Sequence, residues 1–142
     1  MQNGPQALAH LLCIKPTATG GELTVPSQSK FNPAHHITQT GTIHDFLITS
    51  DRRHLKFHIP WSKTTREQGA NVIALSNITA LCPCEAFELH WSWNQAVPDG
   101  FSLFAFIDEH GTPRHMTKSK FLKFITSIWN SAGMKHVLGH SF

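Results

Sequence analysis

The stretch of sequence that decides the expected fold covers residues 54–75 and reads HLKFHIPWSKTTREQGANVIAL. Polar and apolar side chains alternate in its first part, where the apolar residues are Leu55, Phe57 and Ile59. An extended chain sends successive side chains to opposite faces, so this period of two predicts a strand over residues 54–59 with one buried face.

The second part of the stretch predicts a returning strand. Pro60 ends the first strand, and residues 61–69 form a polar connection. The β-branched run at residues 71–75 is typical of a strand. The expected hairpin therefore carries Lys63 near its tip, with Arg66 in the same connection. Most lysines at such a place are solvated surface residues, but a lysine on a stiff hairpin can also be held against a phosphate.

Around the hairpin we expect an α+β fold, with a three-stranded antiparallel sheet flanked by helices. The first strand falls within residues 43–49, and a further short strand within residues 102–107. The expected helices cover residues 5–14, 83–94 and 118–132. In the second helix the residues expected to be buried are Ala86, Phe87, Leu89, Trp91 and Trp93. His35 and His36 are expected in a surface loop.

The last of these helices has a regular apolar stripe and an unusual first turn. Thr117 and Gly133 suit its two caps. The stripe consists of Phe121, Phe124, Ile125, Ile128 and Trp129. Lys118 and Lys120 lie at the positive end of the helix, where each costs about 0.3–1 kcal/mol. A DNA phosphate there would reverse the sign by accepting from the N–H groups and pairing with both lysines; ordinary solvated lysines are the alternative.

Composition limits the class of protein. The chain has 142 residues, of which 40% are hydrophobic and 15% are charged, as expected for one globular domain. The 12 basic and 9 acidic residues give a net charge of +3, a mild bias compatible with nucleic acid. No apolar run reaches the roughly 20 residues of a membrane span, and no signal-peptide pattern opens the chain. We therefore expect a soluble, intracellular protein with no membrane partner.

Neither the cysteines nor the histidines predict a metal site. Cys13, Cys82 and Cys84 are an odd number and lack the second pair that a zinc knuckle needs, so buried or unreactive thiols are expected. His54 and His58 are separated by about 13 Å along a predicted strand, whereas both imidazoles must lie within about 2.1 Å of one zinc ion. We expect no metal and no other cofactor.

Three segments, in this order and spacing, carry a resemblance to a known family. They read IPWSKTTREQGANVIAL, LCPCEAFELHWSWN and SLFAFIDEHGTPRHMTKSKFLKFITSIWNSAGMKHVLGHSF. Together they resemble the catalytic domain of tyrosine recombinases, and more narrowly the integrase-like, DNA breaking-and-rejoining proteins of fungal mobile elements. The resemblance covers residues 21–142, so residues 1–20 are expected to form an N-terminal helix and a degraded start of the core.

The resemblance implies roles for several residues. In this family a tyrosine attacks a DNA phosphodiester, cations surround the phosphate, and a hairpin lysine protonates the leaving 5′ oxygen. Lys63 matches that lysine, and His140 matches the first position of the family's His-x-x-Arg box. The resemblance thus implies a nuclear protein with weak, salt-sensitive DNA contacts at Lys63, Arg66, Lys118 and Lys120.

The sequence departs from the family pattern at the groups that cleave DNA. Thr19 stands where the family has its first arginine, the chain ends at Phe142 before the second arginine, and it contains no tyrosine. We therefore expect a truncated or degenerate recombinase that does not cleave DNA alone. The missing segment would leave apolar surface uncovered, from which we expect low solubility or self-association.

Three hypotheses remain open. A degenerate recombinase fragment would keep weak DNA binding, whereas a domesticated interaction module would have none, and a salt series of DNA binding separates the two. An active recombinase with an incomplete gene model would continue past the Phe142 codon to an arginine and a tyrosine.

Overall fold

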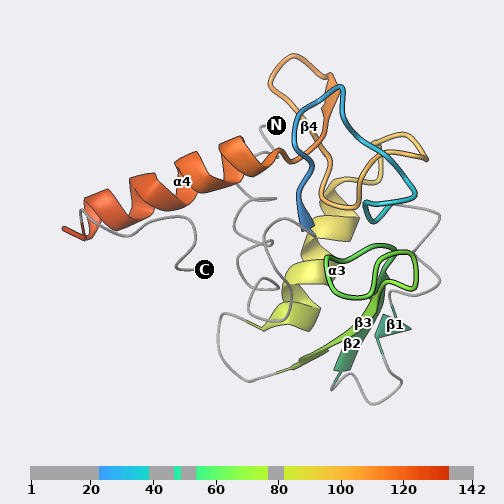
Figure 1. The fold of residues 1–142 in the computed structure, drawn as a ribbon. Helices are drawn as coiled ribbons and strands as arrows, with labels where there is room; N and C mark the ends of the chain where they lie inside the picture. The colour runs from blue at the N-terminus through green and yellow to red at the C-terminus, as the bar shows by residue number, and fades with distance from the viewer. Residues whose placement is uncertain (1–22, 39–46, 49–53, 77–81, 135–142) are drawn as a thin grey trace.

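The fold is known from a computed structural model, which describes residues 23–38, 47–48, 54–76 and 82–134 (Figure 1). Within these residues the chain forms two helices and two small antiparallel sheets, so the predicted α+β class is confirmed. The predicted helix at residues 5–14 lies outside the described residues, as do Cys13, Thr19 and His140.

The hairpin is formed by strands β2 (His54–Ile59) and β3 (Ala70–Leu75). They pair antiparallel with a register that runs from His54 opposite Leu75 to Ile59 opposite Ala70. The period of two holds, because Phe57 and Ile59 are buried on β2, and so are Val72 and Ala74 on β3. The predicted hairpin is therefore confirmed.

Of the predicted first strand, the structure describes only β1 (Leu47–Ile48), which pairs antiparallel with Lys56 and Leu55 at the outer side of β2. The order along this sheet is β1-β2-β3. The neighbouring residues 43–46 and 49 are outside the described part, so a full-length third strand is not shown.

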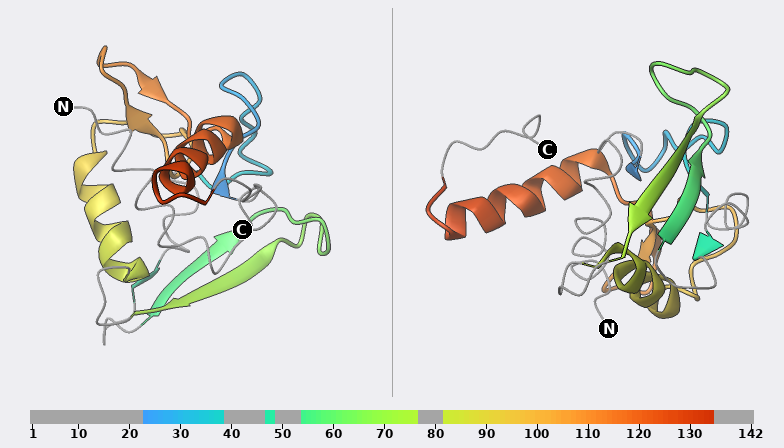
Figure 2. Two further views of the ribbon diagram at one scale, coloured as in Figure 1. Left: turned by 90° about the vertical axis from the view of Figure 1, so that its left-hand side faces the viewer. Right: turned by 90° about the horizontal axis from the view of Figure 1, so that it is seen from below.

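Helix α3 (Pro83–Trp93) lies beside the hairpin (Figure 2). Pro83 in its first turn and Glu85 at its positive end are as predicted. Its buried residues, however, are Pro83, Cys84, Ala86, Phe87 and His90. The predicted burial of Leu89 and Trp93 is wrong, since these side chains are 45% and 47% exposed.

His90 explains why the buried face of α3 differs from the predicted one. Its Nε2 lies 2.9 Å from the carbonyl oxygen of Leu103, and its Nδ1 lies 3.3 Å from the amide nitrogen of Asn94. A carbonyl accepts and an amide nitrogen donates, so both ring nitrogens are satisfied in one neutral tautomer. Because a satisfied polar side chain can be buried without a large free-energy cost, the stripe at 83, 86, 87 and 90 faces the core.

The predicted strand at 102–107 is only partly present. Strand β4 is limited to Phe106–Ile107 and pairs with β5 (Pro113–Arg114), which the sequence did not predict. Leu103, Phe104 and Ala105 are all buried, which an alternating strand does not allow. These residues instead belong to a turn that the Ala105 N–H closes by donating to the Ser102 carbonyl at 2.9 Å.

Helix α4 (Lys118–Ser131) has the predicted caps. The Thr117 hydroxyl oxygen accepts from the Lys120 N–H, and Gly133 has a φ of 79° just after the helix. Its core stripe is shorter than predicted: Phe121 and Ile125 are buried, whereas Ile128 is 41% exposed. Figures 1 and 2 show why, because the second half of α4 extends beyond the sheet and α3.

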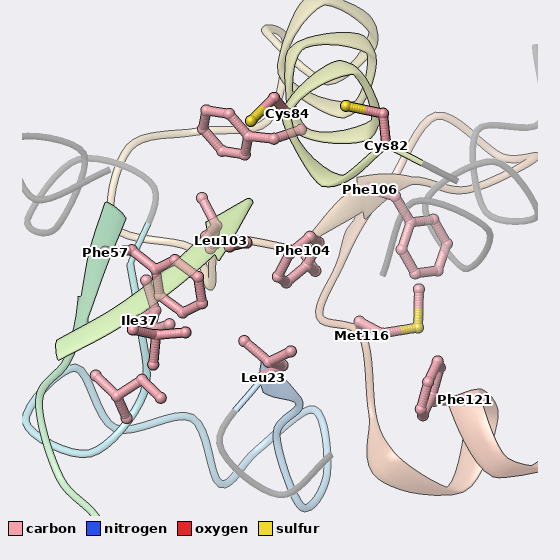
Figure 3. Close-up of a cluster of buried hydrophobic side chains, with 14 of the residues drawn as sticks. Leu23, Ile37, Phe57, Cys82, Cys84, Leu103, Phe104, Phe106, Met116 and Phe121 are labelled. Carbon is pink, nitrogen blue, oxygen red and sulfur yellow. The ribbon is translucent and has the colours of Figure 1, made fainter. Parts of the chain in front are cut away.

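The core joins segments that are far apart in the sequence (Figure 3). Its labelled members come from the segment 23–38, the hairpin, both helices and the residues between them: Leu23, Ile37, Phe57, Cys82, Cys84, Leu103, Phe104, Phe106, Met116 and Phe121. The segment 23–38 is tied to the chain just before α4, since the Val25 N–H donates to the carbonyl of Met116, two residues before the helix, at 3.0 Å. Gln28 adds two side-chain hydrogen bonds to the backbone of His115.

No helix among the described residues is long and apolar enough to cross a membrane.

Candidate nucleic-acid interface

The connection between β2 and β3 is a closed loop. The Arg66 N–H donates to the Ser62 carbonyl at 2.9 Å, and the Ser62 N–H donates back to the Arg66 carbonyl at 3.3 Å. The Gly69 N–H donates to the same Arg66 carbonyl at 3.1 Å. These backbone hydrogen bonds join the two sides of the connection and so fix the backbone conformation of the loop.

Two hydroxyl side chains complete this loop. Ser62 Oγ lies 2.6 Å from Thr65 Oγ1 and accepts from the Thr65 N–H at 3.1 Å. Thr65 Oγ1 in turn is hydrogen-bonded to the carbonyl oxygen of Gly69. Because a carbonyl only accepts, the Thr65 hydroxyl donates to Gly69 and therefore accepts from the Ser62 hydroxyl. We call these three residues the hydroxyl clasp.

Lys63 and Thr64 form the exposed apex of this loop, between the two residues of the clasp that carry hydroxyl groups. Lys63 is thus on a hairpin tip, as predicted, and its side chain is exposed. Its four-carbon stem can move, while the backbone that carries it is fixed on both sides by the clasp.

Arg66 is also exposed, but its position is more constrained. Its φ of 53° lies in the left-handed region, which is uncommon for residues with a Cβ. Its guanidinium carbon lies 5.6 Å from the centroid of the Trp61 ring, within range of a cation–π contact. Arg66 and Lys63 therefore lie on one loop, as predicted.

The Trp61 ring links the loop to the segment 23–38. His35 stacks on Trp61 with the ring centroids 5.3 Å apart, and the His36 ring follows at 6.5 Å from that of His35. His35 is exposed, as predicted, whereas His36 is half-buried, so its prediction as a surface residue is met only in part. The His36 ring also stacks on Phe31, with the centroids 5.8 Å apart.

The ring contacts continue toward the core. His115 stacks between Phe31 and Phe101, at 4.6 and 4.7 Å. Burial lowers the pKa of the His115 imidazole, and the neighbouring His36 lowers it further. Burial also lowers the pKa of His36, partly opposed by a hydrogen bond to the Asn32 backbone. Sequence reasoning missed this connected set of rings, because residues 31–36, 61 and 101–115 share no local periodicity.

The other two predicted DNA-contacting residues, Lys118 and Lys120, begin α4 and differ from each other. Both are exposed, and in addition Lys120 Nζ lies 4.5 Å from the centroid of the Phe106 ring, in a cation–π contact. Their backbone N–H groups already have acceptors, the Val25 carbonyl at 2.9 Å and the Thr117 hydroxyl at 3.3 Å. A phosphate at this helix end would therefore have to bind the side chains rather than these two N–H groups.

Metal binding was not predicted, and among the residues that the structure describes no three metal-ligating side chains come together. Cys82 and Cys84 are buried, as predicted. His58 Nδ1 lies 2.8 Å from the Asn71 side-chain oxygen, across the hairpin.

Comparison with protein families, with curated proteins and with solved structures found no match. The function of the chain is therefore argued from the hairpin tip and its surroundings.

Proposed function

We propose that this chain binds DNA through the tip of its β2–β3 hairpin, as part of a domain related to the catalytic core of tyrosine recombinases. The observation that carries the proposal is the exposed Lys63 at the apex of a loop closed by the hydroxyl clasp. Arg66, on the same loop and against Trp61, supplies a second cation.

A fixed loop suits a phosphate contact for a physical reason. Binding costs free energy for every side chain and loop that must be ordered, so a preformed loop loses less than a flexible one. The partner that fits two exposed cations and a small net positive charge of +3 is a phosphate backbone, contacted without reading the base sequence.

The resemblance assigns a further role to the same lysine. In a complete recombinase site Lys63 would donate the proton that the leaving 5′ oxygen needs, and His140 would contribute beside the phosphate. The 142 residues contain no tyrosine. For these residues the proposal is therefore DNA binding in the nucleus; strand cleavage would need a nucleophile that they do not contain.

The test is binding to fluorescent duplex DNA of unrelated sequences over a salt series. Wild-type affinity should fall steeply with salt, and Lys63→Ala should lower the slope of log affinity against log salt by about 1. Lys123→Ala is the matched control, since Lys123 is an exposed lysine in the middle of α4. Absence of binding at low salt, or equal effects of the two substitutions, would overturn the proposal.

We also propose self-association, on the evidence of the outward face of β3. Ile73 and Leu75 are 53% and 64% exposed there, although both are large apolar residues. Lys56, opposite Ile73, and Asn71 lie on the same face, so the proposed contact with a second copy has an apolar centre and a polar edge. Sedimentation velocity should show an assembly that grows with concentration and is reduced by Ile73→Lys; a monomer at all concentrations would contradict this.

A further inference from the structure

We infer that Thr65 is a positioning residue that holds Lys63 in place for its phosphate partner. This inference rests on the proposed DNA binding and adds to it the group that sets the geometry of the lysine. Thr65 itself need not touch DNA.

The hydrogen bonds of Thr65 join the two ends of the loop. Its N–H and hydroxyl oxygen both meet Ser62 Oγ, at 3.1 and 2.6 Å, on the side where the chain leaves β2. Its hydroxyl hydrogen goes to Gly69, on the side where the chain enters β3. One side chain thus fixes the distance between the two sides of the loop.

Lys63 lies within the segment that this side chain encloses. Only Lys63 and Thr64 separate Ser62 from Thr65, so the backbone of both apex residues is held at its two ends. Without the clasp, the apex would sample more conformations, and the ammonium group would have to be ordered again on contact with a phosphate.

Thr65 itself is exposed, so a substitution there leaves no cavity in the core. Its two partners, Ser62 and Gly69, are buried, so groups released by the loss of the hydroxyl also lower the stability of the fold. Urea denaturation of each variant therefore accompanies the binding measurements, which are made under conditions where the variant is folded. Valine has the shape of threonine without the hydroxyl, and serine keeps the hydroxyl, so this pair of substitutions separates hydrogen bonding from packing.

Thr64 provides a matched control one residue away. It is exposed at the apex, and among the described contacts its hydroxyl makes no hydrogen bond. Thr64→Val therefore makes the same chemical change beside Lys63 and leaves the clasp intact.

The experiment measures DNA binding of Thr65→Val, Thr65→Ser and Thr64→Val, each with Lys63 present and with Lys63→Ala. With Lys63 present, Thr65→Val should weaken binding about threefold to tenfold, the factor expected when hydrogen bonds that order a loop are lost. Thr65→Ser should restore most of the affinity, and Thr64→Val should leave it unchanged. With Lys63→Ala, Thr65→Val should weaken binding clearly less than it does with Lys63 present, because only the contact of Arg66 on the same loop then remains.

A second readout needs no DNA. Backbone order parameters of the Lys63 and Thr64 amides, measured by NMR relaxation, should fall in Thr65→Val and not in Thr64→Val. Unchanged order parameters would overturn the inference, as would an equal loss of DNA affinity with and without Lys63. If the wild type binds no DNA, the proposed function fails, and the order parameters alone then decide whether Thr65 positions the apex.

Discussion

The hairpin tip and the first turn of α4 both carry exposed lysines, but the contacts of these lysines differ. At the tip, Lys63 is exposed on a loop whose own hydrogen bonds are satisfied internally. At the start of α4, Lys120 lies over Phe106, and its N–H donates to Thr117. Arg66 over Trp61 and Lys120 over Phe106 both carry a ring contact, whereas no such contact of Lys63 is present among the described residues.

The backbone hydrogen bonds of the two regions also differ in what they leave exposed. In the hairpin loop the backbone is closed by Ser62, Thr65 and Arg66, and the closure leaves the apex exposed. In α4 the first turn is closed by Thr117 and Val25, and this closure uses N–H groups that a phosphate could have accepted from. The hairpin tip is the stronger candidate for DNA contact for this reason.

The largest expected change in stability comes from a substitution in the hairpin loop. Gly69 has a φ of 64°, and a Cβ there would overlap the Ile59 carbonyl oxygen and come within 2.6 Å of His58 Nε2. Gly69→Ala should lower the free energy of unfolding by about 2–4 kcal/mol, of which the left-handed backbone accounts for about 1. Urea denaturation followed by fluorescence of the tryptophans measures this change.

Gly111→Ala is the control for the backbone alone. Gly111 has a φ of 75°, and nothing lies within 4 Å of a Cβ placed on it. Its substitution should cost about 1 kcal/mol. Equal losses in the two variants would mean that the close approach of Ile59 and His58 to Gly69 does not constrain the loop.

A smaller change in stability is expected from substitution of the lysines at the start of α4. Lys120→Ala removes the contact with Phe106 and should lower the free energy of unfolding by about 0.5–1 kcal/mol. Lys118→Ala should leave it unchanged or raise it by about 0.3 kcal/mol, because a cation leaves the positive end of a helix. Thermal or urea denaturation of the two variants gives the comparison, and a larger loss for Lys118→Ala would contradict it.

The smallest effect concerns the rings behind the hairpin tip and depends on pH. The pKa values of His36 and His115 are lowered below the ordinary 6.5, so the unfolded chain takes up protons before the folded one does. Their contribution to stability is therefore complete above pH 6.5 and is lost as the pH falls through their folded pKa values. Urea denaturation between pH 7.5 and about 5 should show this loss.

His36→Gln should reduce the pH dependence, and His110→Gln should not. His110 is the matched histidine, because its side chain is exposed on the turn between β4 and β5. A pH dependence that both substitutions leave unchanged would exclude the ring contacts of His36 as its source.

Much of the fold could be predicted because its signals are local. The alternation at residues 54–59, the proline at 83 and the caps Thr117 and Gly133 each act within a few residues, and each predicted element is present. The strand predicted at 102–107 is mostly absent because its apolar residues are buried in a turn that Ser102 closes. Apolar composition alone does not distinguish a strand from a buried turn.

The candidate site could be predicted only in part. Lys63 and Arg66 were found from their place in a hairpin connection, and both are exposed there. The ring contacts beside this loop were not predicted, because the stacking of Trp61 on His35 joins two segments that no local sequence pattern relates. The contact of Lys120 with Phe106 was missed for the same reason.

The sequence by itself determined the hairpin, the positions of α3 and α4 and the lysine at the loop apex, since these follow from periodicity, proline, glycine and capping residues. Only the tertiary structure decided which face of α3 is buried, how far the apolar stripe of α4 packs and which cations are already paired. The physical reason is that burial and pairing depend on neighbours brought together by folding. His90 on Leu103 and Gln28 on His115 are such neighbours, and the second pair is separated by 87 residues.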